Sequence, residues 1–201
     1  MEHMKTIKLN PEKLDKKILL EIAVILKNGG IVVFPTDTVY GIIASAKHKK
    51  SIKKIFEIKN RPLNKPLSLF VKNLSMAKKL SNIEKDKKNL LKSLWPGKTT
   101  AVLETKKNTL PSEFFAKKTI AMRIPDYKPL NFILKKIDTP LVQTSANISG
   151  KQTTNDPKKI FKTFEKKEAK PDFIINVGKL AGNKSSTVLD LTSDPPKILR
   201  S

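Results

Sequence analysis

Apolar side chains in the first part of the chain recur three and four residues apart, which predicts an amphipathic helix. Asn10 and Pro11 are predicted to be its N-cap and first helical residue, and Asn28-Gly29-Gly30 is expected to end it. The same spacing returns in further segments that we expect to be helical, namely 51–58, 75–80, 84–94, 128–136 and 157–166.

Short continuous apolar runs between these segments predict buried β-strands. The first run, Ile31 to Phe34, is halted by Pro35, and residues 36–48 are expected to form a loop. The other expected strands are 67–71, 99–104, 119–124, 140–144, 173–177, 187–191 and 197–199. Because helices and strands interleave throughout, we predict one α/β domain over residues 5–201, with a mixed sheet. Residues 1–4 are set aside as a candidate tag remnant.

The chain is strongly basic, with a formal net charge of +23. Such a charge attracts polyanions such as RNA and nucleotides, but lysines scattered in short pairs are also typical of solvated surfaces. No apolar run approaches the length of a membrane span, and no signal peptide is visible at the N-terminus, so a cytoplasmic protein is expected.

Of the 41 basic residues, only Arg61, Arg123 and Arg200 are arginine. Arginine offers a rigid fork of donors that grips a carboxylate or phosphate bidentately, whereas lysine is a flexible point charge. These three positions are therefore the first candidates for an anion site. Arg123 shares one face of its expected strand with Thr119 and Ala121, and a charge in an apolar strand needs a partner or a ligand.

Several kinds of chemistry are excluded by composition. The chain has no cysteine and only two histidines, so thiolate chemistry, a histidine-based triad and a histidine metal cluster are not expected, and no metal-binding residue is predicted. Gly97-Lys98-Thr99 resembles the end of a phosphate-binding P-loop, but position 92 is lysine where that motif requires glycine. Asp37 is left open between a role with a metal or proton and simple turn capping.

Polar segments follow two strands directly, at 35–41 and 142–150, where α/β sheets bind ligands. Turn capping by threonine, serine and asparagine is the alternative interpretation. Between a helix end and a strand, Lys59, Arg61 and Lys65 lie around prolines and suggest a rigid anion clamp. Interaction with the helix dipole is an alternative explanation for Lys59, but it accounts less well for Lys65.

These segments belong to a series of short motifs in fixed order: Pro35-Thr36-Asp37-Thr38-Val39-Tyr40-Gly41, Lys59-x-Arg61-Pro62, Lys65-Pro66-Leu67, Trp95-Pro96-Gly97, Arg123-x-Pro125, Thr144-Ser145-Ala146-Asn147-x-Ser149-Gly150 and Ser186-Thr187-Val188. Their order and spacing, from about residue 10 to Arg200, resemble the YrdC/TsaC family of threonylcarbamoyl-AMP synthases. The resemblance implies a single twisted mixed sheet flanked by helices, with a large basic cavity. It also implies a nucleotidyltransferase that converts L-threonine, bicarbonate or CO2, and ATP into L-threonylcarbamoyladenylate and pyrophosphate.

The resemblance further implies how the site is divided. ATP is assigned to Lys59, Arg61, Lys65, Thr119, Asn147, Thr154 (or Thr153) and Arg200. Threonine is assigned to Thr36, Thr38, Tyr40, Arg123, Ser145 and Ser186, with Arg123 gripping its carboxylate. No protein nucleophile is needed, Lys59 and Arg61 are the most important for charge stabilisation, and Mg²⁺ is expected to arrive with ATP.

The implied partners are TsaD-, TsaB- and TsaE-type proteins of tRNA modification, and contact with tRNA itself is left open. The sequence departs from the family where Phe70 replaces a histidine near threonine, and where Lys98-Thr99 follows the Trp95-Pro96-Gly97 motif. The C-terminal domain of longer members is also expected to be absent. The alternatives are a non-catalytic RNA-binding protein of the same fold and a YciO-like paralogue.

Overall fold

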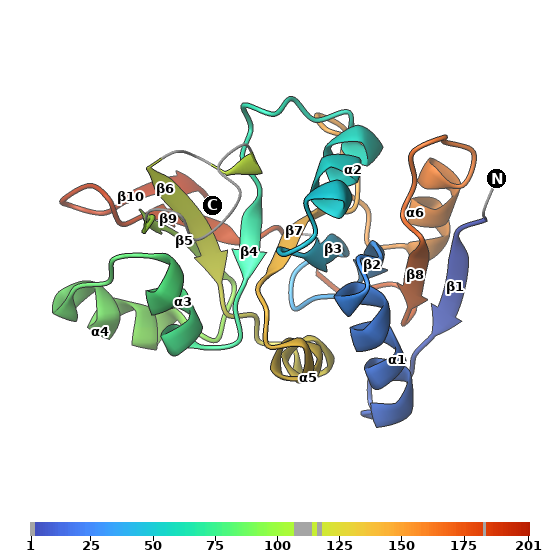
Figure 1. Ribbon diagram of the computed structural model, residues 1–201, viewed down its shortest axis with the longest axis horizontal. Coiled ribbons are helices and arrows are strands. Elements are labelled where there is room, and N and C mark those ends of the chain that lie inside the picture. Colours follow the sequence, from blue (N-terminus) through green and yellow to red (C-terminus); the bar gives the residue numbers. More distant parts are fainter. Residues whose placement is uncertain (1–2, 107–113, 116–117, 183) are drawn as a thin grey trace.

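A mixed sheet runs through the whole of the computed structural model, which describes residues 3–106, 114–115, 118–182 and 184–201. Within these residues the strand order is β1-β8-β2-β3-β7-β4-β6-β5-β9-β10 (Figure 1). The strands are β1 (Lys5–Lys8), β2 (Val32–Phe34), β3 (Gly41–Ser45), β4 (Ser68–Phe70), β5 (Thr99–Glu104), β6 (Thr119–Arg123), β7 (Leu141–Ser145), β8 (Phe173–Asn176), β9 (Thr187–Asp190) and β10 (Lys197–Arg200). A single sheet with flanking helices confirms the predicted α/β class.

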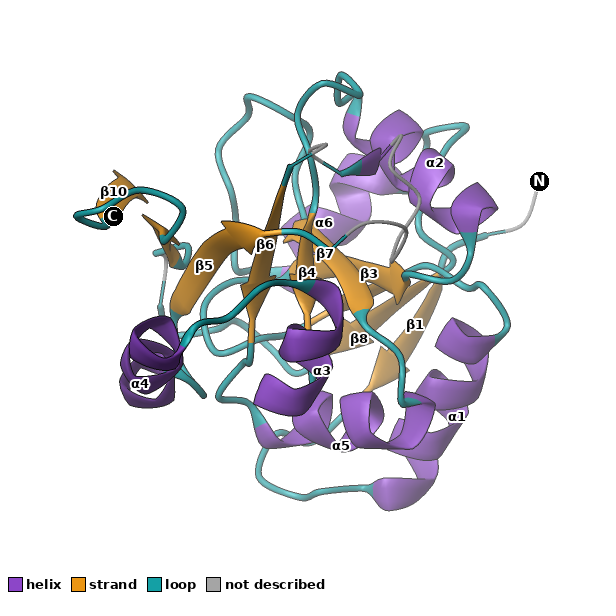
Figure 2. Ribbon diagram, turned by 60° about the vertical axis from the view of Figure 1, so that its left-hand side comes forward, coloured by secondary structure: helices purple, strands orange, loops and turns teal. Residues whose placement is uncertain are grey.

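Helices cover both faces of the sheet (Figures 1 and 2). They are α1 (Lys16–Lys27), α2 (Lys49–Lys59), α3 (Leu74–Leu80), α4 (Lys85–Leu94), α5 (Lys128–Ile137) and α6 (Pro157–Phe164). Successive β2 residues point to opposite faces, so Val32 and Phe34 pack with α1 and α5, whereas Val33 packs with α2 and α6. Each face thus has its own apolar core.

The first helix begins later than the sequence pattern predicted. Asp15, rather than Asn10, is the N-cap of α1, and its carboxylate accepts hydrogen bonds from the main-chain N of Lys17 and Ile18. The Asn10 side chain instead accepts from the main-chain N of Glu12 and forms a turn before the helix. The prediction was wrong because asparagine followed by proline favours a turn as much as a helix start.

Two strands were missed. Residues 41–45 lie in the expected loop 36–48 but form β3, a buried strand that pairs antiparallel with β2 and β7. Its small, apolar residues follow so soon after Pro35 that they gave no separate signal. β1 is mostly exposed and rich in lysine, as edge strands often are. Met4, from the segment set aside, is buried in the core.

The centre of the sheet places the polar segments together. β4 lies between β6, with which it is parallel, and β7, with which it is antiparallel. Ser68 is therefore aligned with Ala121 on one side and with Gln143 on the other. The segments predicted from different parts of the chain meet over this region.

Candidate functional site

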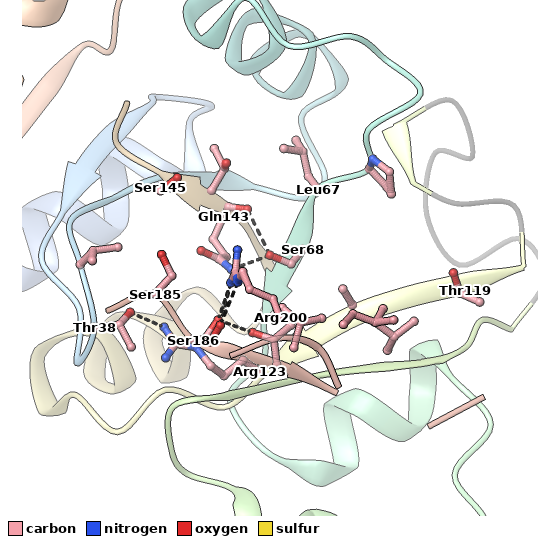
Figure 3. A pocket seen from close by; sticks show the side chains of 18 of the residues that line it. Thr38, Leu67, Ser68, Thr119, Arg123, Gln143, Ser145, Ser185, Ser186 and Arg200 are labelled. Carbon is pink, nitrogen blue, oxygen red and sulfur yellow. Dashed lines mark hydrogen bonds between the residues drawn. The ribbon is translucent and has the colours of Figure 1, made fainter. Parts of the chain in front are cut away.

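The arginines at 61, 123 and 200 line one cavity of about 390 Å³ over β4, β5, β6, β7, β9 and β10 (Figure 3). Hydroxyl and amide groups make up most of its other polar lining. No aspartate or glutamate is among its described lining residues. The full lining is Thr38, Val39, Arg61, Pro66, Leu67, Ser68, Thr100, Val102, Thr119, Ala121, Arg123, Gln143, Thr144, Ser145, Ser185, Ser186, Val188, Leu199 and Arg200.

The Arg123 guanidinium is held on several sides although its side chain is only 2% exposed. Its NH1 lies 3.1 Å from Oδ1 of Asp37, its NH2 donates to Oγ1 of Thr38 at 3.4 Å, and it stacks on the ring of Phe70 at 5.0 Å. Its Nε is buried without a hydrogen-bond partner among the described residues. Burial lowers the pKa of Arg123, and Arg200 acts in the same direction, while Asp37 opposes both.

Asp37 is therefore a structural partner of Arg123 rather than a capping residue alone. Its Oδ2 also accepts a hydrogen bond from the main-chain N of Asp126 at 3.1 Å, which fixes the carboxylate. Among the described residues, no group of three or more His, Cys, Asp or Glu side chains is placed to hold a metal ion. The sequence left Asp37 open between a role with a metal or proton and turn capping, and the structure adds a buried ion pair with Arg123.

Arg200 lines the cavity from the last strand, and the pairing of β10 with β9 is irregular between Ile198 and Arg200. Its Nε and NH2 both donate to the main-chain O of Ser186, at 3.1 and 2.8 Å, and NH2 also lies 3.2 Å from Oγ of Ser186. That hydroxyl is 2.9 Å from Oγ1 of Thr100. The guanidinium thus clamps the segment that carries Ser186 against β5.

Arg61 grips its own loop. Its Nε donates to the main-chain O of Lys65 at 2.8 Å and its NH2 donates to the main-chain O of Pro66 at 2.9 Å. Burial lowers the pKa of this guanidinium. Lys65 itself is exposed and lies outside the cavity lining. The Arg61 side chain therefore folds back on the loop that follows it and ties residues 61–66 together.

Lys59 does not line the cavity but lies beneath one of its walls. The side chain is buried, and its ammonium donates to the main-chain O of Ser145, the main-chain O of Asn147 at 2.7 Å, and Oδ1 of Asn147 at 3.0 Å. Oγ of Ser145 also donates to Oδ1 of Asn147 at 2.7 Å. Lys59 thus shapes the segment that presents Ser145.

Because the Lys59 side chain is buried, we expect the free energy of unfolding to depend on pH. Desolvation, followed by the charge of Arg61, lowers the pKa of Lys59 to about 7. Between pH 7 and the usual lysine value the unfolded chain binds more protons than the folded one, so stability should rise with pH. Relative to Lys59→Met, the wild type should gain about 2 kcal/mol of unfolding free energy between about pH 7 and 9 in urea titrations. Lys53→Met, on the exposed side of α2, is the matched control, and equal slopes in wild type and Lys59→Met would contradict the burial argument.

The remaining predicted residues divide into two groups. Thr38, Thr119, Ser145 and Ser186 lie in the cavity lining. The others, Thr36, Tyr40, Asn147 and Thr154, are not among the lining residues. Thr36 accepts from the main-chain N of Thr38, and the Tyr40 hydroxyl donates to the main-chain O of Gly178, so both support the wall. Burial raises the pKa of Tyr40 to about 12.

Sequence reasoning missed Ser68, Gln143 and Thr100, which all line the cavity. Nε2 of Gln143 donates to Oγ of Ser68 (Figure 3). For Gln143 strand alternation was an available signal, because it lies two residues before Ser145. Ser68 had no such signal, because only the sheet register aligns it with Ala121.

The chain is similar to proteins of one family. A family model named Sua5_yciO_yrdC, described as telomere recombination, matches residues 24–201. A protein of Methanocaldococcus jannaschii with the provisional name threonylcarbamoyl-AMP synthase is 36% identical over 192 residues, which cover 95% of this chain and 88% of that protein.

Two solved structures are also similar. Pyrococcus abyssi Sua5 complexed with L-threonine has a TM-score of 0.87 and 30% identity, over 98% of this chain and 56% of that one. The present chain thus spans little more than half of that longer relative. Escherichia coli YciO has a TM-score of 0.85 and 28% identity, over 100% and 96% of the two chains. With the family model matching most of its length, the chain belongs to the Sua5/YciO/YrdC family.

Proposed function

We propose that this protein is a threonylcarbamoyl-AMP synthase, which joins L-threonine, bicarbonate or CO2, and ATP and releases pyrophosphate. The observation that carries the proposal is the meeting of three arginines in one cavity whose described lining has hydroxyls and amides but no carboxylate. Such a lining suits substrates that bring a carboxylate, an inorganic carbon anion and a triphosphate together. Family membership and the name of the M. jannaschii relative support it.

Threonine is assigned to the end of the cavity that contains Arg123. The guanidinium, which lines the cavity, would receive the amino-acid carboxylate there. Thr38, Ser145 and Ser186 would complete this subsite, while Thr36 and Tyr40 hold the wall behind it. The threonine complex of P. abyssi Sua5 supports an amino-acid site in this fold.

ATP is assigned to Arg61, Thr119 and Arg200 in the lining, with Lys65 at the exposed rim. Asn147 and Thr154 lie outside the lining and would contact nucleotide only if their segments approach it. Lys59 acts here as a positioning residue, since its ammonium is occupied by Ser145 and Asn147. Mg²⁺ would be held by the phosphates of ATP and would offset their charge.

The reaction needs no protein nucleophile. The threonine amine adds to CO2 and gives up a proton to water, which leaves a carbamate. A carbamate oxygen then attacks the α-phosphorus of ATP, the bond to the β-phosphate oxygen breaks, and pyrophosphate leaves. The protein contributes position and stabilisation of crowded negative charge, which is what fixed arginines supply.

A second candidate is RNA binding without chemistry, favoured by the net charge of +23. A third is a YciO-like paralogue with another reaction, favoured by the likeness to E. coli YciO over nearly the full length of both chains. As a synthase, the protein would act in the cytoplasm, and a TsaD-type transferase with TsaB- and TsaE-type helpers would pass its product to tRNA. In the described residues, no helix is long and apolar enough to cross a membrane.

Pyrophosphate release separates these candidates. A synthase should release pyrophosphate from ATP when threonine and bicarbonate are both present, and omission of either should return the rate to background. A coupled pyrophosphate assay in CO2-depleted buffer measures this directly. Tight RNA binding without such release would refute the proposal and favour the binding protein.

A further inference from the structure

One row of aligned residues crosses the middle of the cavity floor. Gln143 on β7, Ser68 on β4, Ala121 on β6 and Val102 on β5 are successive partners in the sheet register, and all four line the cavity. The row contains no charged group. Its polar members are Ser68 and Gln143, which contact each other (Figure 3).

This row lies between Arg123 at one end of the cavity and Thr119 and Arg61 at the other. Arg200, which pairs with Val188 and bonds Ser186, lies at the Arg123 end. Along β6, Thr119 and Arg123 stand two residues before and after Ala121, and all three line the cavity. A strand rises by about 3.3 Å per residue, so the row lies about 7 Å along the strand from each. If one part of a ligand is held near Arg123 and another part near Thr119 and Arg61, the group that joins the two parts must lie over this row.

The donors in this row are neutral and partly free. Oγ of Ser68 accepts from Nε2 of Gln143, and the acceptor for its own proton, the main-chain O of Gln143, is 3.4 Å away. That contact is long for a hydroxyl donor, so the proton is available to a ligand. Within the described residues, the second amide hydrogen of Gln143 likewise has no partner. Together they offer two neutral donors side by side.

We propose that Ser68 and Gln143 bind the inorganic carbon and the carbamate formed from it, an inference that rests on the proposed synthase reaction. Threonine held by its carboxylate on Arg123 has its amine two bonds away from the carboxylate carbon, and the carbamate carbon is bonded to that amine. The carbamate would therefore lie over the row that contains Ser68 and Gln143.

Neutral donors suit this position for a chemical reason. The carbamate oxygen must keep its electron density to attack the α-phosphorus. A charged donor forms a hydrogen bond roughly twice as strong as a neutral one and would hold that density back. A hydroxyl and an amide orient the carbamate without neutralising it, while the arginines act at the carboxylate and the phosphates.

The test is the bicarbonate dependence of pyrophosphate release, with carbonic anhydrase present so that CO2 and bicarbonate stay in equilibrium. Ser68→Ala should raise the KM for total inorganic carbon about tenfold, as expected for loss of one hydrogen bond to a charged group. The KM for threonine and ATP should change by less than about twofold. Gln143→Glu, which has the same shape but brings a negative charge, should raise the KM for total inorganic carbon further than Ser68→Ala does. Ser68→Thr, which keeps the hydroxyl, should stay within about threefold of the wild type.

Ser93→Ala, on the exposed side of α4, is the matched control and should leave all three constants unchanged. An unchanged KM for inorganic carbon in both Ser68→Ala and Gln143→Glu would overturn the inference, and so would an equal rise in all three constants. A wild-type protein without pyrophosphate release would instead refute the synthase function itself. Melting temperatures show whether Ser68→Ala or Gln143→Glu fails to fold. If one of them does, the KM for inorganic carbon of the other decides the test.

Discussion

Replacement of Arg123 by methionine should remove threonine-dependent pyrophosphate release and lower the free energy of unfolding by about 3–5 kcal/mol. The stability loss arises because Asp37 would keep a buried carboxylate with no cation beside it. The loss of activity arises because the amino-acid carboxylate would have no fixed fork to bind. Urea titration and the pyrophosphate assay measure the two effects separately.

The double variant Arg123→Met, Asp37→Asn separates structure from binding. It removes both charges, and asparagine keeps an oxygen that can accept from the main-chain N of Asp126. Replacement of a buried ion pair by neutral groups is often close to neutral for stability, so most of the lost stability should return. Threonine binding, measured by calorimetry, should not return. Recovery of threonine binding in the double variant would mean that Arg123 serves the fold and not the substrate.

Replacement of Arg61 by lysine should lower kcat/KM for ATP about 10- to 100-fold although the charge is kept. Arg61 donates from two nitrogens to the carbonyls of Lys65 and Pro66. A lysine ammonium has no planar fork, so at least one of these hydrogen bonds is lost, at about 1.5–3 kcal/mol. Steady-state kinetics with ATP varied at saturating threonine measures the effect.

Lys65→Met gives the comparison for Arg61→Lys. It removes an exposed charge but keeps the carbonyl that Arg61 holds, so its effect should be smaller and should weaken with added salt. If Arg61→Lys had wild-type kinetics, the argument from the fork would be refuted.

Most helices and central strands could be predicted because their apolar spacing reflects which face they bury. β3 could not, because it is buried on both faces and follows a segment whose proline, threonines and aspartate are typical of a loop. The start of α1 was misplaced because Asn10-Pro11 and Asp15 are both plausible caps, and only the contacts of Asp15 with Lys17 and Ile18 decide between them.

The sequence predicted which charged residues lie at the candidate site, but it did not predict most of their side-chain contacts. Rarity of arginine pointed to Arg61, Arg123 and Arg200, and the structure brings all three to one cavity. The occupied ammonium of Lys59 and the loop contacts of Arg61 depend on side-chain conformations that sequence spacing does not determine. Asp37 was ambiguous because its partner, Arg123, is distant in sequence. Ser68 and Gln143 depend on the register of β4 with β7, which no local pattern predicts.

Incorporation of label from ¹⁴C-bicarbonate into a nucleotide product tests the central claim most directly. With threonine and ATP present, the wild type should form a labelled adenylate that separates from AMP and ATP by chromatography, in equal amount to the pyrophosphate released. Arg123→Met should form none above background. Pyrophosphate release without label in the nucleotide, or label that appears without threonine, would contradict the account.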